Sequence, residues 1–185
     1  EHLERIRSSA AYFGFRFDAE GAVGALKHAV EDRGPDPVRV RLALARDGGL
    51  TVEVSALAPA ADGPVRVALD DEPVDPADVW LYHKTTRRAP YDRRRGRRPD
   101  VDDVVLVNDR GEATESTIAN LAVRLDGRWV TPPVDAGLLP GSYRGLLVRE
   151  GTLEERRVTI AELRGAGEVA LVSSVRGWRP ATVVP

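Results

Sequence analysis

The sequence contains no cysteine and no methionine. The absence of cysteine excludes disulfide bonds and thiolate chemistry, and it leaves the compartment of the protein open. The absence of methionine means that the chain lacks a start residue, and it opens at Glu1 with apolar residues already at helical spacing. We therefore expect this sequence to be part of a longer polypeptide.

Long apolar runs and a large excess of one charge are also missing. No apolar segment approaches the roughly 20 residues that span a bilayer, and no signal peptide is visible. The formal net charge is −2, so nothing global points to a nucleic acid or an anionic membrane as a partner. With 185 residues, 42% of them hydrophobic, the chain can bury the core of one domain or two small ones. These bounds favour a cytoplasmic enzyme.

Lysine is scarce, because the chain has only Lys27 and Lys84 against 25 arginines. Lys84 follows the apolar, strand-like run 79–82, whereas Lys27 sits in a helical pattern with no surrounding motif. A solvated lysine at a strand end is the simplest interpretation of Lys84. However, a chain that uses arginine for almost every cation makes a retained lysine less ordinary. A lysine in a site can act as a nucleophile toward carbonyl groups and as a base.

Residues 1–72 have the pattern of a small α/β domain with an antiparallel sheet. Asp18 is a good N-cap, and the Asp-Gly-Gly sequence 47–49 is typical of a hairpin turn. The predicted elements are a helix over 2–13, a helix between Asp18 and Gly34, a hairpin of strands 39–45 and 50–54, and a strand over 65–69. Residues 73–78, rich in Pro and Asp, are predicted to form a linker.

Residues 79–185 are predicted to form a larger domain, so that the whole chain has an α/β (α+β) fold. Residues 87–100 carry seven arginines and are predicted to be a polar loop. Thr159 and Glu162 have the spacing of a capping box. The predicted elements are a strand from Trp80 to Lys84, a strand over 104–107, a hairpin of strands 118–124 and 128–131, helices over 141–150 and 159–163, and a final strand over 168–172.

Three separated segments carry residue types that suit pyridoxal 5'-phosphate: a lysine, a carboxylate and a Pro-Gly turn that enters a helix. Lys84 could form a Schiff base with the cofactor, and Glu115 could keep its pyridine nitrogen protonated. The backbone amides after Pro140 could meet the phosphate. Glu112 is the competing carboxylate, but it follows a turn and is expected at the surface. None of the three segments is diagnostic alone, and their order along the chain favours the interpretation.

The runs 83–92, 114–121 and 173–181 resemble the fold-type IV pyridoxal-phosphate enzymes, which include branched-chain and D-amino acid aminotransferases. Among these enzymes the chain is most similar to aminodeoxychorismate lyase, of the kind fused to the aminodeoxychorismate synthase component. The resemblance implies a homodimeric lyase that converts 4-amino-4-deoxychorismate to 4-aminobenzoate and pyruvate for folate synthesis. It also implies a small N-terminal domain, a larger cofactor-binding domain, and a strand region that precedes Glu1 and helps to shape the substrate pocket.

The same resemblance implies individual roles, with Lys84 as the catalytic residue. Arg88 and Tyr91 are expected to contact the substrate, although Arg88 lies among many arginines that are expected to be solvated. Arg5 lies in a run, His2 to Ile6, that is similar to the family's phosphate-binding helix. The implied cofactor-binding residues are Arg5, Lys84, Glu115, Asn120, Gly141, Ser142, Tyr143, Ser173 and Ser174.

Three alternatives stay open on the sequence. The first is a transaminase on the same scaffold, and the second is the same fold with an inactive site. The third is a non-catalytic module whose Arg87–Arg98 segment binds nucleic acid or another polyanion. The near-neutral net charge, and Tyr91 as the single aromatic residue of that segment, count against this third alternative. The three histidines form no cluster with carboxylates, so no metal site is expected.

Overall fold

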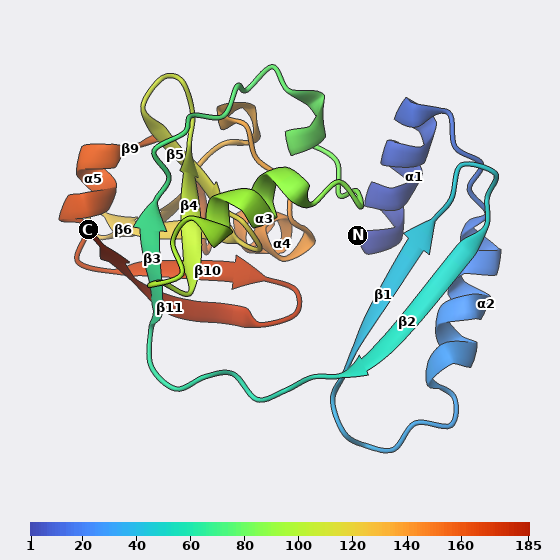
Figure 1. Cartoon of the computed structure of the whole chain (residues 1–185). Helices are drawn as coiled ribbons and strands as arrows, with labels where there is room; N and C mark the ends of the chain where they lie inside the picture. The colour runs from blue at the N-terminus through green and yellow to red at the C-terminus, as the bar shows by residue number, and fades with distance from the viewer. The chain divides into compact units, whose positions relative to one another are not determined.

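The computed structural model describes all 185 residues of the chain. They form two compact units, Glu1–Ala61 and Asp62–Pro185, and each unit is described by itself. Helices and strands occur in both units, which confirms the predicted mixed α/β fold class (Figure 1). None of the helices is both long enough and apolar enough to cross a membrane.

The first unit consists of two helices and one hairpin. Its elements are α1 (His2–Phe13), α2 (Ala19–Val30), β1 (Val38–Leu44) and β2 (Leu50–Ala56). The Asp18 side chain accepts a hydrogen bond from the backbone N–H of Glu20, as expected of the N-cap of α2. β1 and β2 pair antiparallel from Val38 opposite Ala56 to Leu44 opposite Leu50. These two helices and the hairpin confirm the local predictions for this part of the sequence.

The second unit carries the larger sheet and the remaining helices. Its strands are β3 (Val65–Leu69), β4 (Asp103–Val107), β5 (Glu112–Ser116), β6 (Asn120–Leu125), β7 (Arg128–Thr131), β8 (Glu154–Glu155), β9 (Val158–Thr159), β10 (Val169–Ser173) and β11 (Gly177–Val184). Its helices are η1 (Val79–Leu81), α3 (Ala89–Gly96), η2 (Val134–Ala136), α4 (Ser142–Arg149) and α5 (Ile160–Gly165). Thr159 and Glu162 form the predicted capping box at the start of α5.

Six strands of this sheet close into a barrel. The hydrogen-bonded order is β8-β7-β6-β10-β11-β3-β4-β5-β9, and β5 also pairs with β6, which joins the two arms of the sheet. The pairs β11–β3 and β3–β4 are parallel, and the other pairs around the ring are antiparallel. Closure removes the unpaired edges of these strands and brings the ends of β5 and β6 together.

The core of the second unit lies inside this closed sheet. Val67, Val105, Leu121 and Val123 are fully buried there, together with Leu163 of α5. Residues 104–107 form a continuous apolar run without alternation, which is typical of a strand that is covered on both faces. A second cluster packs α4 against the outside of β10, and Leu147 and Ala170 are among its members.

The strand 65–69 belongs to the large sheet and not to the small N-terminal domain in which we predicted it. β3 lies between β11 and β4, and Val67 pairs with Asp103 on one side and Val183 on the other. The structure therefore divides the chain after Ala61, earlier than the predicted boundary at 72. Residues 73–78, predicted to be a linker, pack within the second unit, where Val74 is buried and bridges to Asn108.

Two further predictions, a strand from Trp80 to Lys84 and a polar loop over 87–100, are wrong. The run 79–81 forms the short helix η1, because the Asp78 side chain caps the Trp80 N–H and Leu81 turns into the core. A short apolar run does not by itself distinguish a strand from a buried turn of helix. The arginine-rich segment contains α3, whose Arg94 and Arg97 bind the carboxylate of Asp70.

The strand over 168–172 is present as β10, but it is not the last strand. β11 follows after a tight turn and runs antiparallel to β10, as Figure 1 shows in red at the C-terminal end. Pro180 lies in the middle of β11, opposite Ala170. A proline lowers the expectation of a central strand because it cannot donate to the ladder, and this explains why the sequence analysis did not predict β11.

Candidate functional site

The buried carboxylate Glu115 lies at the point where the barrel closes. Glu115 of β5 and Asn120 of β6 are partners in the closing pair, and each is only 5% exposed. The side-chain amide of Asn120 donates to Glu115 Oε2 over 3.2 Å and to the carbonyl of Leu139 over 2.9 Å. Asn120 therefore connects the carboxylate to the turn that leads into α4.

Gly141, the N-cap of α4, packs directly against Asn120. A Cβ at this position would lie 2.0 Å from Asn120 Oδ1, closer than any side chain permits. Gly141 has an ordinary φ of −65°, so glycine is required here by close approach and not by backbone conformation. The first turn of α4, with Ser142 and Tyr143, is thus held close to the Glu115–Asn120 pair.

The environment of Glu115 strongly disfavours its charge. Complete burial raises the pKa of Glu115 to about 8, although a backbone hydrogen bond from Leu139 and the positive charges of three side chains act in the opposite direction. These side chains are Lys84, Arg88 and Arg144. The site is therefore a buried carboxyl group, largely neutral at pH 7, with cationic side chains around it. A cationic partner in contact with Glu115 would restore its negative charge.

Lys84 lies in an irregular segment after η1 and not at a strand end. Its side chain is solvent-exposed, and its charge is one of those that act on Glu115. His83, which we predicted on the opposite face of a strand, is half-buried in the same irregular segment. Burial lowers the pKa of His83, so its imidazole is neutral at pH 7.

Arg88 and Tyr91 belong to the same cluster. An Arg88 Nη2–H donates to the carbonyl of Thr117 over 2.6 Å, and Arg88 Cζ lies 4.6 Å from the centre of the Tyr91 ring. Burial raises the pKa of the Tyr91 hydroxyl, and the negative charge of Glu115 raises it further. The predicted substrate-binding residues thus lie together at the start of α3.

Ser173 and Ser174 lie beside the closing pair at the end of β10. Val172 is the cross-strand partner of Asn120, so the two serines follow immediately after the position that faces it. The Ser173 hydroxyl accepts a hydrogen bond from the backbone N–H of Arg176, which holds the β10–β11 turn. Arg5, by contrast, lies half-buried on α1 in the first unit, and its pairing with a phosphate stays a prediction.

Arg144 is a residue of this cluster that the sequence analysis missed. It is only 4% exposed, and its guanidinium donates to the carbonyl of Pro132 and to Glu155 Oε1 over 2.7 and 2.6 Å. Its Nε has no hydrogen-bond partner. The spacing along the predicted helix could have indicated that Arg144 is buried. Arg144 and the buried Leu147 are three residues apart and share the inward face of α4.

The comparison with protein families decides what kind of protein carries this cluster. The model of a family described as amino-transferase class IV matches residues 1–184. The chain belongs to this family. Class IV aminotransferases and the related lyases depend on pyridoxal phosphate and act on small molecules. The predicted resemblance to the fold-type IV enzymes is therefore confirmed.

Individual relatives carry two different activities in their names. A Schizosaccharomyces pombe protein named "Putative aminodeoxychorismate lyase" is 30% identical over 184 residues, which cover 95% of this chain and 79% of that protein. A Mesorhizobium loti protein of known structure, described as a "Putative amino-acid aminotransferase", has a TM-score of 0.92 and 36% identity, over 99% of this chain and 90% of its own. Branched-chain aminotransferase from Escherichia coli has a TM-score of 0.82 at 15% identity, over 98% of this chain and 68% of its own, and shares the fold.

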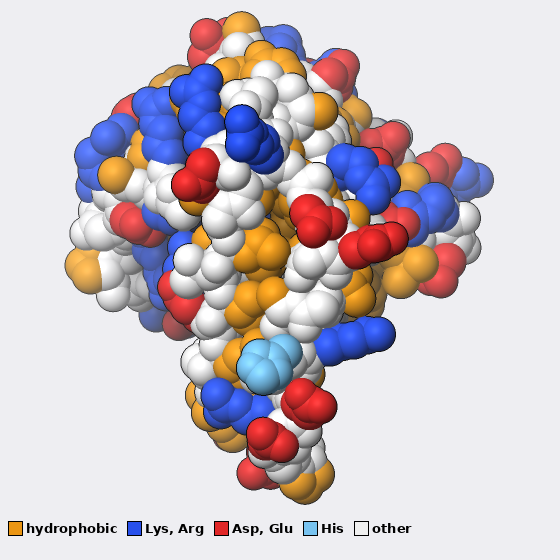
Figure 2. All heavy atoms as spheres, turned by 90° about the vertical axis from the view of Figure 1, so that its right-hand side faces the viewer, with side chains coloured by type: hydrophobic (Ala, Val, Ile, Leu, Met, Phe, Trp, Pro, Cys, Tyr) orange, Lys and Arg blue, Asp and Glu red, His pale blue; other side chains and the backbone are white.

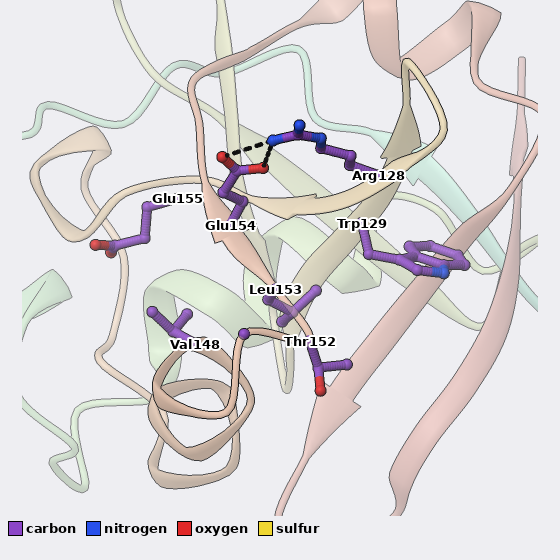
Figure 3. A pocket seen from close by; sticks show the side chains of 8 residues that line it. Arg128, Trp129, Val148, Thr152, Leu153, Glu154 and Glu155 are labelled. Atoms are coloured by element: carbon purple, nitrogen blue, oxygen red, sulfur yellow. Dashed lines mark hydrogen bonds and ion pairs between the residues drawn. The ribbon is translucent and has the colours of Figure 1, made fainter.

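A surface pocket of about 600 Å³ lies elsewhere on the second unit (Figure 3). It is formed by residues of β7, the end of α4 and β8, and the ion pair between Arg128 and Glu154 closes one side. Trp129, Val148 and Leu153 supply its apolar wall. None of the predicted site residues lines this pocket, but Glu155 in its lining pairs with Arg144 of the Glu115 cluster.

The arginines of the predicted polyanion-binding segment serve mainly to anchor α3. Arg94 and Arg97 bind Asp70 and Glu72, Arg93 also reaches Glu72, and Arg98 pairs with Asp100. Elsewhere on the surface, the face in Figure 2, which is the right-hand side of Figure 1, also carries acidic side chains interspersed with basic ones. Charges that are neutralised within the fold are poorly suited to binding a phosphate backbone.

Proposed function

We propose that this chain is a pyridoxal-phosphate-dependent lyase that converts 4-amino-4-deoxychorismate to 4-aminobenzoate and pyruvate. The observation that carries the proposal is the buried Glu115, held by Asn120 and surrounded by Lys84 and Arg88. The S. pombe relative, whose name gives the same activity, supports this choice within the family. The reaction needs no oxidant or amino acceptor, since the atoms of the substrate are divided between the two products.

The donor set of the cluster suits pyridoxal phosphate. Glu115 is a buried carboxyl group whose charge a pyridinium N–H would stabilise, and Lys84 supplies the amine for covalent attachment. Gly141, Ser142 and Tyr143 would hold the phosphate through the first turn of α4. Ser173 and Ser174 would complete the phosphate site, and the pairing of Arg5 with the phosphate stays a prediction from the resemblance. The cofactor supplies an electron sink for negative charge at the substrate Cα.

Each protein group then has a definite task. Glu115 holds the ring-nitrogen proton, and Asn120 fixes the direction of the Glu115 carboxylate through its amide. Lys84 Nζ takes the proton from the substrate Cα, for which its neutral amine must be positioned and partly desolvated. Arg88 binds a substrate carboxylate with its guanidinium fork, and Tyr91 supports the guanidinium from one face.

The assembly and location of the enzyme follow from the same proposal. We expect a homodimer with the site near the interface, as the resemblance to fold-type IV enzymes implies. We also expect a cytoplasmic location, as the proposed role in folate synthesis implies. Analytical ultracentrifugation of the full-length protein tests the first expectation, and a monomer at micromolar concentration would contradict it.

The test of the proposal is the visible absorption of the full-length protein after addition of pyridoxal phosphate, before and after borohydride. The wild type is expected to show an absorption band that borohydride removes, and Lys84→Ala is expected to lose it. Lys27→Ala is the matched control, because Lys27 is the only other lysine and lies on α2 in the first unit. A wild type without such a band contradicts the proposal.

A transaminase is the second candidate, and the M. loti structure favours it. That protein is 36% identical over nearly the whole chain and is described as an aminotransferase. Dependence on an amino acceptor separates the two activities. The lyase releases pyruvate from aminodeoxychorismate without any added keto acid, whereas a transaminase turns over only when a keto acid accepts the amino group.

A further inference from the structure

Arg88 is held in place before any ligand arrives. Its bond to the Thr117 carbonyl uses one of the five N–H groups of the guanidinium, and the Tyr91 ring covers one face. The side chain is 40% exposed, and its Nη2 lies 4.0 Å from the carboxylate of the exposed Asp92. A preorganised arginine loses less conformational entropy when it binds a carboxylate.

The carbonyl that holds Arg88 is itself fixed from the interior of the barrel. Thr117 is 2% exposed, and its hydroxyl donates to Asp103 Oδ1, which also accepts from the Val104 N–H. The Thr117 N–H donates to the Val104 carbonyl over 3.1 Å. Thr117 thus has its hydroxyl and its N–H bound to β4 while its carbonyl faces Arg88.

Asp103 is an unusual residue for its position. It is fully buried, it begins a strand whose other four residues are apolar, and its Oδ2 has no hydrogen-bond partner. A buried carboxyl group with an unmatched oxygen costs free energy that valine or threonine would not cost. A buried residue that lowers stability in this way is expected where it has a role in a functional site.

We infer that Thr117 and Asp103 are positioning residues that hold Arg88 for a substrate with a carboxylate separate from its reacting amino carbon. The inference rests on the proposed function and adds to it the groups that set this preference. Asp103 orients the Thr117 hydroxyl, the Thr117 carbonyl orients Arg88, and Arg88 binds the carboxylate. Neither Thr117 nor Asp103 touches the substrate.

The test compares two ligands of the cofactor-loaded enzyme: isophthalate, which has two carboxylates, and 3-carbamoylbenzoate, in which an amide replaces one. Binding is followed by titration of the visible absorption of the enzyme. The wild type is expected to bind isophthalate about 10-fold more tightly, the value of one charge-assisted hydrogen bond. Thr117→Val is expected to reduce this ratio to about 2 and Thr117→Ser to restore it.

Turnover and a matched control complete the design. Thr117→Val is expected to raise the KM for aminodeoxychorismate about 10-fold and to change kcat less than about 3-fold, because Arg88 contributes binding. Thr131→Val is the control, since Thr131 is fully buried and its hydroxyl has no hydrogen-bond partner. If Thr117→Val does not fold, Asp103→Asn replaces it, with an expected loss of about 3-fold in the ligand ratio.

The outcomes separate the inference from the proposed function. An unchanged ligand ratio in Thr117→Val, together with a lost ratio in Arg88→Met, overturns the positioning role and leaves the lyase intact. Equal binding of the two ligands by the wild type overturns the whole inference. A wild type without a borohydride-sensitive absorption band overturns the proposed function, and the inference falls with it.

Discussion

The two ends of β5 carry two glutamates with opposite environments. Burial alone would raise the pKa of Glu112, but hydrogen bonds from Asn108, Arg110 and Arg157 outweigh it and lower the pKa. Glu115, three residues later, is fully buried, and its pKa is raised to about 8. Its hydrogen bonds come from neutral donors, the Asn120 amide and the Leu139 backbone.

The difference indicates which carboxylate is structural. Glu112 has its charge balanced by two arginines of the fold, so a ligand could add little to it. Glu115 lies near positive charges but is hydrogen-bonded to no cation, and a cationic ligand would stabilise its ionised form. Strongly shifted carboxyl groups of this kind concentrate at functional sites. The predictions below test this contrast, from the largest expected effect to the smallest.

Replacement of Glu115 is expected to have the largest effect. Glu115→Gln keeps the shape of the side chain but cannot balance a pyridinium charge, so turnover is expected to fall by about 10³-fold or more. Glu112→Gln is expected to change turnover by less than about 3-fold. Steady-state kinetics of the cofactor-saturated variants measure both values. Equal losses in the two variants would contradict the contrast between the ends of β5.

The pH dependence of stability is expected to show the Glu115 carboxyl group directly. Its folded pKa of about 8 lies above the unfolded value near 4.5, so the native state holds a proton that the unfolded state releases. Without cofactor, the free energy of unfolding is expected to fall by about 5 kcal/mol as pH rises through this interval. Denaturant titrations at several pH values measure it. Glu115→Gln should flatten this decline, and a decline of equal size in the variant would exclude Glu115 as its source.

Gly141 and Gly145 offer a matched pair on α4. Gly141→Ala places a methyl group against Asn120 and is expected to weaken cofactor binding about 10²-fold, since the turn must move away from Glu115. Gly145→Ala places its methyl group 3.4 Å from the Arg149 guanidinium and is expected to stabilise the helix by about 0.5 kcal/mol. Fluorescence titration with pyridoxal phosphate measures the first effect. If the two variants bind pyridoxal phosphate with equal affinity, the close approach of Gly141 to Asn120 does not hold the cofactor site.

Replacement of Glu112 is expected to have the smallest effect, and it concerns stability. Glu112→Gln leaves Arg110 and Arg157 with weaker partners and is expected to lower the free energy of unfolding by about 1 kcal/mol at pH 7. The difference in the free energy of unfolding between the wild type and the variant is expected to disappear as pH falls through the lowered pKa of Glu112. Thermal unfolding at pH 7 and pH 3 measures this, and a loss that persists at pH 3 would contradict the ionic origin.

Elements with strong local signals were predictable from the sequence. The β1–β2 hairpin, the Asp18 cap and the Thr159–Glu162 capping box depend on residues within a few positions of one another. The helix η1 was not predictable in this way, because its apolar residues match a strand equally well. The helix α3 was hidden because its stabilising partners, Asp70 and Glu72, lie more than twenty residues earlier.

The sequence by itself determined the order of the motifs, the local helices and hairpins, and the family resemblance that the comparison confirmed. Only the tertiary structure decided that the strands close into a ring, that Glu115 is buried there with a raised pKa, and that Asn120 requires glycine at 141. The reason is physical: caps and turns depend on neighbours in the chain, whereas burial and close approach depend on barrel closure, which joins distant strands.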